Sequence, residues 1–287
     1  MRKLRIIIAL LIICGQAVRL NAQDDLGVWI GAGLEKGIAK GTDIQVEGQY
    51  RFSDMFKTTD RWNASVSLSK RIYRNKSKSF NVKGSVSYKF IKVYSPWSTK
   101  NKSPYDLIDD DLDPQYYIDN EYDFNHTSSY FENRHRFTAA LSAGLEAGRF
   151  KFSIRESYQY TFSDSIYVSR TKHRFESKYD EEQEDDVMIH TWTDESTNKG
   201  GMDKHILRSR IGISYNIPHW KYDPFMTYEL FNNLNQGFSV EKSRLTAGVD
   251  FSFAKKHDFK IAYIWQGKKD DDSSTGSAIS VDYIFSF

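Results

Sequence analysis

The sequence predicts an all-β protein, a transmembrane antiparallel up-and-down β-barrel of ten to twelve strands with long extracellular loops. Three observations predict it. The last eleven residues, Ser277 to Phe287, alternate strictly and place Ile279, Val281, Tyr283 and Phe285 on one face. Segments of similar length and period recur along the chain, and about ten residues suffice to cross a bilayer as a tilted strand. The mean hydropathy is negative although 15% of the residues are aromatic, which is typical of barrels whose strands are half polar.

Eleven segments show the two-residue period of a half-buried strand. In chain order they are Leu26 to Lys36, Thr42 to Phe52, Arg61 to Ile72, Phe80 to Phe90, Arg134 to Ala147, Phe150 to Phe162, Leu207 to Tyr215, Tyr222 to Phe231, Lys242 to Phe253, Phe259 to Gln266 and Ser277 to Phe287.

Each segment is justified by an apolar face opposite a polar one. The apolar positions of the first four are Leu26, Val28, Ile30, Ala32 and Leu34; Ile44, Val46, Tyr50 and Phe52; Trp62, Ala64, Val66 and Leu68; Phe80, Val82, Val86, Tyr88 and Phe90. Those of the next three are Phe137, Ala139, Leu141, Ala143 and Leu145; Phe150, Phe152, Ile154, Tyr158, Tyr160 and Phe162; Leu207, Ile211, Ile213 and Tyr215. Glu156 interrupts the sixth segment, and the eighth is the least regular.

The connections between segments alternate in length, which predicts the two sides of the membrane. Short turns lie at Gly37 to Gly41, Arg74 to Lys78, Gly148-Arg149, Ile217 to Lys221 and Ala254 to Asp258. Long connections lie at about 95–130 and 163–203. Because short turns face the periplasm and long loops face the exterior in bacterial barrels, residues 23–287 are expected to form one barrel with two large exterior loops.

The count of eleven is odd, whereas single-chain bacterial barrels have even strand numbers. We therefore expect ten or twelve strands, either because one strand is missed or because Leu26 to Lys36 is not an ordinary barrel strand. A soluble β-sandwich is the alternative fold, since many short alternating strands also suit it. A sandwich, however, gives no reason for connections that alternate between short and long.

The start of the sequence predicts a secretory signal peptide over residues 1–22. A basic stretch from Met1 to Arg5 precedes an apolar run from Ile6 to Cys14, and a small residue, Ala22, ends the segment. Nine apolar residues are too few to cross a membrane as a helix. Ile13 stands before the only cysteine, where a lipoprotein signal needs a small residue, so the mature chain is expected to reach the bacterial outer membrane without a thiol.

The charge of the chain excludes one class of partner. The formal charge is +2, and removal of residues 1–22, which hold four basic residues and no acidic one, would bring it to about −2. A general basic field for nucleic acid is therefore absent. The expected partners are outer-membrane lipid and lipopolysaccharide, and the barrel-assembly machinery through the C-terminal strand that ends at Phe287.

If the apolar faces meet lipid, the polar faces line a lumen that is rich in basic groups. The candidate lumen-lining residues are Arg51, Arg61, Lys83, Arg134, Arg136, Arg155, Arg208, Arg210, Glu229, Arg244, Asp250 and Asp282. Charges at low dielectric need partners, so one interpretation is a filled, structural interior in which these groups neutralise one another. The other is a narrow, porin-like pore that favours anionic solutes.

The predicted exterior loops are acidic, and Asp106 to Asp123 holds no basic residue. The spacing Asp109, Asp111, Asp113 resembles the opening of a calcium loop. Its sixth position is Pro114, where such a loop needs Gly, and its twelfth position lacks the Glu that binds through both oxygens. The loops are therefore expected to be solvated, with loose binding of divalent cations as the alternative.

The sequence offers weak signals for an enzyme. The seven histidines are scattered, and the H-E-x-x-H, G-x-S-x-G and Walker patterns do not occur. No catalytic, metal or cofactor site is therefore predicted. Membrane-embedded lipid hydrolases place Ser and His on the outer face of a barrel, and His135 lies in the lipid-side register near a strand end. An enzyme that acts on lipid or lipopolysaccharide is thus the alternative to a structural or pore-forming barrel.

Six short motifs make the chain resemble a known family. They are Gly27-Val28-Trp29, Gln49-Tyr50-Arg51-Phe52, Asp60-Arg61-Trp62, Arg155-Glu156-Ser157-Tyr158, Leu207-Arg208-Ser209-Arg210 and Tyr228-Glu229-Leu230-Phe231. Together they span nearly the whole mature chain and resemble domain-of-unknown-function family 2490, which comprises small bacterial outer-membrane barrels. The resemblance implies outer-membrane placement and supplies no activity.

Overall fold

The computed structural model of the protein describes residues 26–103, 110–180, 185–254, 256–267 and 276–287. The predicted signal peptide, residues 1–22, lies outside these ranges. The chain divides into two compact units, which we call the barrel unit and the second unit. The barrel unit takes its described residues from Leu26 to Ile91, Arg136 to Tyr160 and Lys204 to Phe287, and the second unit comprises Lys92–His135 and Thr161–Asp203.

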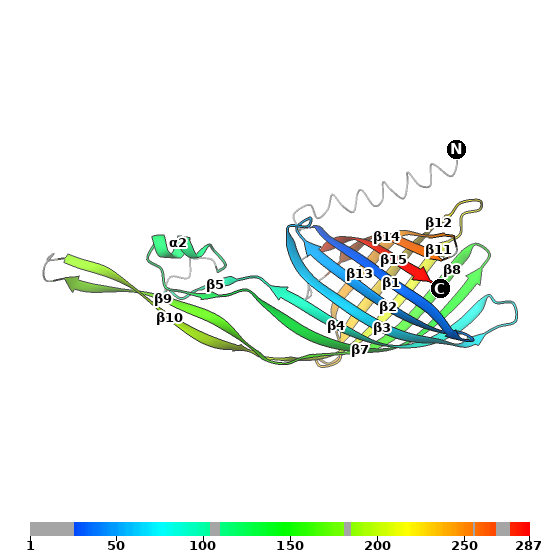
Figure 1. The fold of residues 1–287 in the computed structure, drawn as a ribbon, viewed down its shortest axis with the longest axis horizontal. Coiled ribbons are helices and arrows are strands. Elements are labelled where there is room, and N and C mark those ends of the chain that lie inside the picture. Colours follow the sequence, from blue (N-terminus) through cyan, green and yellow to red (C-terminus); the bar gives the residue numbers. More distant parts are fainter. Residues whose placement is uncertain (1–25, 104–109, 181–184, 255, 268–275) are drawn as a thin grey trace. The chain divides into compact units, whose positions relative to one another are not determined.

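All eleven predicted segments are strands of one closed barrel (Figure 1). They are β1 (Leu26–Ala39), β2 (Thr42–Ser53), β3 (Thr58–Arg74), β4 (Phe80–Ser95), β7 (Tyr130–Ala147), β8 (Phe150–Ser163), β11 (Met202–Tyr215), β12 (Tyr222–Asn233), β13 (Ser239–Phe253), β14 (His257–Gln266) and β15 (Ser277–Ser286). Around the barrel the order is β1-β15-β14-β13-β12-β11-β8-β7-β4-β3-β2.

The barrel closes between its first and last strands, which run parallel. The register joins Leu26 with Ser277 and continues in step to Glu35 with Ser286. An odd number of strands can close only where two neighbours run in the same direction. The predicted antiparallel barrel of ten to twelve strands is therefore confirmed, with one parallel pair at its closure, and the expectation of an even count is wrong. The segment from Leu26 is a full barrel strand, and it begins at the end of the barrel where β15 also begins.

The interior face is identified by contacts between strands that are not neighbours. Lys83 on β4 forms an ion pair with Asp43 on β2, although β3 lies between these strands. The Arg244 guanidinium on β13 lies over the Trp29 ring on β1, although β14 and β15 separate the two. Such contacts are feasible only across the lumen, so the polar face of each strand points inward.

The outward face is a belt of exposed aliphatic side chains around the barrel. Nine of the strands each contribute at least one exposed side chain to this belt. These side chains are Leu34, Val46, Leu68, Val86, Leu141, Ile154, Ile211, Met226 and Ile261. Aromatic rings form a row at the short-turn end, where Tyr222, Phe251, Phe259 and Tyr283 face one another on β12 to β15 with centroids 4.9 to 5.1 Å apart. This is the arrangement of an aromatic girdle at a membrane interface.

Close packing at the parallel seam depends on small residues. Trp29, Ile264 and Ala278 form a buried cluster in the barrel interior beside the seam. Gly31 lies opposite Asp282 across the seam, and a Cβ atom at Gly31 would overlap the Asp282 carboxylate. Glycine at this position therefore lets the carboxylate lie flat against β1.

The second unit contains a four-stranded sheet where the sequence predicted two loops. Its strands are β5 (Ser98–Asn101), β6 (Phe124–Thr127), β9 (Ile166–Asp180) and β10 (Asp185–Lys199), in the order β10-β9-β6-β5 (Figure 1). A short helix, α2 (Pro114–Asp119), precedes β6. The sequence analysis assigned no strand to these two long connections, because charged side chains occupy one face of β9 and β10 and hide the two-residue period.

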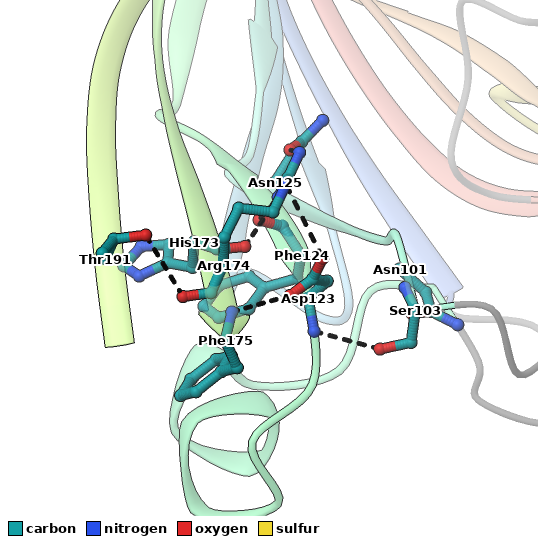
Figure 2. A network of polar contacts seen from close by, with 9 residues as sticks. All are labelled: Asn101, Ser103, Asp123, Phe124, Asn125, His173, Arg174, Phe175 and Thr191. Carbon is teal, nitrogen blue, oxygen red and sulfur yellow. Dashed lines mark hydrogen bonds and ion pairs between the residues drawn. The ribbon is translucent and has the colours of Figure 1, made fainter. Parts of the chain in front are cut away.

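Aromatic packing and a polar network hold the second unit together. Tyr117 of α2 and Phe124 of β6 are fully buried and stack with centroids 4.8 Å apart. Figure 2 shows how Arg174 of β9 connects to β6: its guanidinium donates to the Phe124 carbonyl at 3.1 Å and to the Asn125 side chain at 3.0 Å. The Asp123 carboxylate in turn accepts from the Phe175 amide at 2.9 Å, so β6 is fixed against β9.

Among the described residues, no helix combines the length and the apolar character needed to cross a membrane.

Candidate functional site

The candidate site is a cluster of charged and aromatic side chains inside the barrel, centred on Glu229 of β12. Arg208 on β11 donates to the Glu229 carboxylate at 2.5 Å. Arg210 on β11 lies 3.8 Å and Arg244 on β13 lies 3.6 Å from the same carboxylate. The strand register explains this gathering, because Glu229 pairs directly with Arg210 on one side and with Arg244 on the other.

Two aromatic rings fix the guanidinium groups of this cluster. Arg51 lies 3.8 Å and Arg244 lies 5.2 Å from the centre of the Trp29 ring. Arg208 lies 5.0 Å and Arg244 5.2 Å from the centre of the Phe231 ring. Cation–π contacts of this kind strengthen when water is excluded, so the rings hold the arginines in place without cancelling their charge.

Positive charge exceeds negative charge at this level of the lumen. Glu229 is only 3% exposed and is the carboxylate that Arg208, Arg210 and Arg244 share. Arg155 on β8 also lies within electrostatic range of Arg208 and Arg210. One carboxylate therefore faces four guanidinium groups, and a surplus of positive charge in a low-dielectric space attracts anions.

The lumen is more exposed towards the short-turn end of the barrel. There Lys83 pairs with Asp43 at 3.3 Å, and Lys151 pairs with Asp223 at 3.7 Å across the intervening strand β11. The Lys83 and Lys151 side chains are 39% and 49% exposed, in contrast to the buried groups around Glu229. Water therefore reaches these two ion pairs at the short-turn end.

The structure places the other predicted lumen residues at separate points. Arg61 is bound by the adjacent Asp60 carboxylate at 3.1 Å. Asp250 of β13 pairs in register with Lys260 of β14. Asp282 accepts a hydrogen bond from Ser280 at 2.8 Å and lies against Gly31.

Arg136 and Arg134 on β7 complete the predicted set. Arg136 belongs to the barrel unit and lies within electrostatic range of Arg51. Arg134 belongs to the second unit, where its guanidinium donates to Glu132 at 2.8 Å. The structure thus brings together a set of predicted lumen residues, namely Arg51, Arg136, Arg155, Arg208, Arg210, Glu229 and Arg244.

Sequence reasoning did not single out the two rings that organise the site. Trp29 falls on the opposite face from the apolar positions of the first segment, so its inward direction was implied by the period. Phe231 lies two residues after Glu229 and therefore on the same face. An aromatic residue on an otherwise polar strand face was the signal that could have identified both.

The outward face carries a polar pair in an apolar setting. Ser209 on β11 donates to Glu156 on β8 at 2.7 Å, and Glu156 lines an outward groove of about 640 Å³ with Leu68, Val86 and other apolar residues. His205 is bonded to the Tyr158 hydroxyl at 2.6 Å. The serine therefore bonds directly to the carboxylate, and His205 bonds to Tyr158.

The outward histidine singled out from the sequence has an aromatic neighbour. His135 belongs to the second unit and stacks on Phe162 with centroids 5.0 Å apart. This contact is that of a packed side chain, and a lipid-active enzyme stays an untested alternative.

The acidic residues of the second unit serve local structure. Asp113 accepts a hydrogen bond from the Gln115 amide at 2.8 Å and caps α2, and Asp110 accepts from the Asn101 amide at 2.8 Å. Asp109, the first residue of the predicted cation motif, lies outside the described residues. Within the part of the chain that the structure describes, no group of three or more His, Cys, Asp or Glu side chains could hold a metal ion.

Comparison with known proteins finds a family and several distantly similar structures. The model of the family described as "Protein of unknown function (DUF2490)" matches residues 26–276. None of the curated proteins matches the chain. The fold is similar to the translocator domain of the autotransporter NalP from Neisseria meningitidis, with a TM-score of 0.41 and 14% identity over 86% of this chain and 80% of that one. It is also similar to the β domain of the Bordetella autotransporter BrkA, with a TM-score of 0.30 and 11% identity over 91% of this chain and 92% of that one.

Proposed function

Because the chain belongs to the family "Protein of unknown function (DUF2490)", which supplies no activity, we propose a function from the geometry of the lumen: a narrow outer-membrane barrel selective for small anions. The proposal has two parts, the membrane placement and the selectivity. Each rests on a separate set of side chains.

The belt of exposed aliphatic side chains supports placement in the outer membrane. Soluble monomers rarely expose contiguous apolar patches larger than a few hundred Å². Here exposed aliphatic residues recur on strand after strand, and the aromatic row of Tyr222, Phe251, Phe259 and Tyr283 borders them at the short-turn end. A lipid environment removes the cost of exposing this surface to water.

The observation that carries the anion selectivity is the surplus of guanidinium groups around Glu229. A ring of arginines at a constriction repels cations and lowers the barrier for anions. Glu229 itself neutralises part of the charge, so binding of an anion at this point stays weak enough to permit release. Transport requires both properties.

The packing of the cluster supports a narrow rather than a wide pore. Trp29 and Phe231 are buried at 4% and 6% exposure beside the arginines, so they occupy the cross-section that a wide channel would leave to water. Barrels of about this strand number lie between those filled with side chains and those with open channels. We therefore expect small conductance steps.

The test is conductance of the purified, refolded protein in a planar bilayer. Wild-type protein is expected to give small anion-selective steps, and the double variant Arg208→Gln, Arg210→Gln is expected to lose most of that selectivity. The double variant Arg149→Gln, Lys256→Gln removes two positive charges in the short turns and is expected to retain the selectivity. Absence of steps in correctly folded protein would overturn the pore, and unchanged selectivity in the Arg208 and Arg210 variant would overturn the role of the cluster.

A further inference from the structure

Two histidines face each other on the sheet of the second unit. His173 of β9 and His190 of β10 lie on one face of the sheet, because His173 pairs in register with Trp192 and His190 pairs with Phe175. His173 Nδ1 and His190 Nε2 are 3.0 Å apart, with one nitrogen donating to the other. Two imidazole nitrogens directed at each other at this distance are close to the spacing at which they would share one metal ion.

We propose that His173 and His190 form a two-histidine binding site for a divalent transition metal, with Cu²⁺ as the favoured ion. Metal–nitrogen bonds of about 2.0–2.1 Å and a nitrogen separation of 3.0 Å place the two ligands about 90–95° apart around the metal. That angle fits adjacent corners of the square or tetragonal geometry preferred by Cu²⁺ and Ni²⁺. A tetrahedral ion such as Zn²⁺ requires nitrogens about 3.3–3.4 Å apart, so it fits less well.

Aromatic stacking fixes both imidazoles before any metal arrives. The His173 ring lies parallel to the buried Phe124 ring with centroids 4.3 Å apart. The His190 ring lies nearly parallel to Phe175 with centroids 4.4 Å apart. Each ring must turn by about 40–45° from the line that joins the two nitrogens to aim its lone pair at a shared ion, since the centroids are 5.2 Å apart and the nitrogens face each other along that line.

The backbone that carries His173 is equally constrained. Arg174 bonds to the Phe124 carbonyl and to Asn125, while the Phe175 amide bonds to Asp123 (Figure 2). These contacts hold β9 in register with β6 directly after the histidine. A ligand held by such supporting contacts keeps its geometry when the metal binds.

The protonation state and the exposure of the pair also suit a metal. Burial lowers the pKa of His173, and the neighbouring His190 and His126 add to this effect, so the ring is neutral at pH 7. The ring that donates in the hydrogen bond moves its proton to its other nitrogen when the ion binds, so that both facing nitrogens offer a lone pair. His190 is half-buried and its neighbour Trp192 is exposed, so solvent has access to the ion. Water is expected to complete the coordination, because the described residues contain no larger set of ligands around the pair.

The experiment is titration of the full mature protein in detergent with Cu²⁺, followed by calorimetry and electron paramagnetic resonance. Wild-type protein is expected to bind one Cu²⁺ with a spectrum of two nitrogen ligands, more tightly than Zn²⁺. His173→Gln and, separately, His190→Gln are each expected to weaken binding at least about tenfold. His219→Asn alters a turn histidine of the barrel unit and is expected to leave binding unchanged.

The outcomes that overturn the metal site are specific. Binding that is equally tight in the His190→Gln variant, or a spectrum with one nitrogen in wild-type protein, shows that the pair is only a hydrogen bond within the sheet. Circular dichroism of each variant checks that the fold is retained, and His190→Gln supplies the test if His173→Gln does not fold. Conductance plays no part in this readout, so failure of the metal site and failure of the pore are distinguishable.

Discussion

Glu229 is the residue on which the charge of the lumen depends. It is the buried carboxylate shared by Arg208, Arg210 and Arg244, and it stands within reach of Arg155. Buried ions are stabilised only when their partners remain, and removing one partner leaves uncompensated charge at low dielectric. The residue therefore has two roles, since it permits the arginines to be buried and limits the charge that they present.

Replacement of Glu229 is expected to separate these roles. Glu229→Gln keeps the shape of the side chain but leaves the guanidinium groups without a counter-charge, so we expect a lower free energy of unfolding, by about 3 kcal/mol, and stronger anion selectivity in any protein that folds. Urea unfolding in lipid vesicles and single-channel recording measure the two effects. Glu146→Gln, at the exposed end of β7, is the control, and equal stabilities of the two variants would contradict the role of Glu229.

At the scale of elements, the parallel pair β1 and β15 is the unusual feature of the barrel. Parallel pairing is slightly less stable per residue than antiparallel pairing, so close contact across the seam matters more there. Gly31 permits that contact because its position faces the Asp282 carboxylate.

A methyl group at the seam is expected to weaken the barrel. In Gly31→Ala, the new Cβ overlaps the Asp282 carboxylate, so this side chain must turn away and give up its hydrogen bond from Ser280, and we expect a loss of about 1 kcal/mol. Gly37→Ala is the matched control on the same strand, where the nearest atom to the new Cβ, of Asp43, is 3.8 Å away. Urea unfolding compares the variants, and equal midpoints would show that the seam is not tightly packed at Gly31.

The sheet of the second unit is expected to lose stability in mild acid. The pKa of His173 is lowered from its ordinary value of 6.5, first by burial and then by His190 and His126. Below pH 6.5 the unfolded chain therefore binds a proton at His173 that the folded sheet disfavours. The contribution of His173 to the free energy of unfolding is fully present above pH 6.5, and it is lost as the pH falls towards the lower pKa of His173 in the folded protein. Glu195, whose lowered pKa is due first to a hydrogen bond with Lys172, adds a loss only below about pH 4.5.

Hydrogen exchange of β9 between pH 7.5 and 5.5, corrected for intrinsic exchange rates, measures the effect of His173. Protection of the amides around His173 is expected to fall over this range in wild-type protein and to change less in His173→Gln. A wild-type profile that is flat between these two values would contradict the assigned cause.

The sequence determined the barrel strands because their signal is local. A two-residue period is readable within each segment, and all eleven segments became barrel strands. The parallel seam was not readable, because pairing between β1 and β15 joins the ends of the chain. The second sheet was missed because Arg170 and Lys172 on β9 pair with Glu195 on β10, which makes one face as charged as a loop.

The site was predictable as a set of inward charges but not as a cluster. Period alone placed Arg208, Arg210 and Glu229 on inward faces, and adjacency in the register then brought them together. The contact of Arg244 with Trp29 depends on closure of the barrel, since two strands lie between them. Distances across a lumen follow from strand number and shear, which a single sequence does not display.

At the scale of the whole molecule, a barrel with a lipid-facing outer surface is expected to resist unfolding in detergent. The protein should migrate faster in an unheated sodium dodecyl sulfate gel than after boiling, because the folded barrel is compact and binds less detergent. Gel mobility of the membrane fraction before and after heating measures this property. Identical mobility, or extraction of the protein by urea, would favour a soluble β-sandwich.

The anion-selective lumen is the central claim, and the reversal potential of wild-type protein in a tenfold potassium chloride gradient tests it most directly. The surplus of guanidinium groups around Glu229 predicts a reversal potential close to that of chloride, with small conductance steps. A value close to that of potassium, or the absence of steps from folded protein, would contradict the claim.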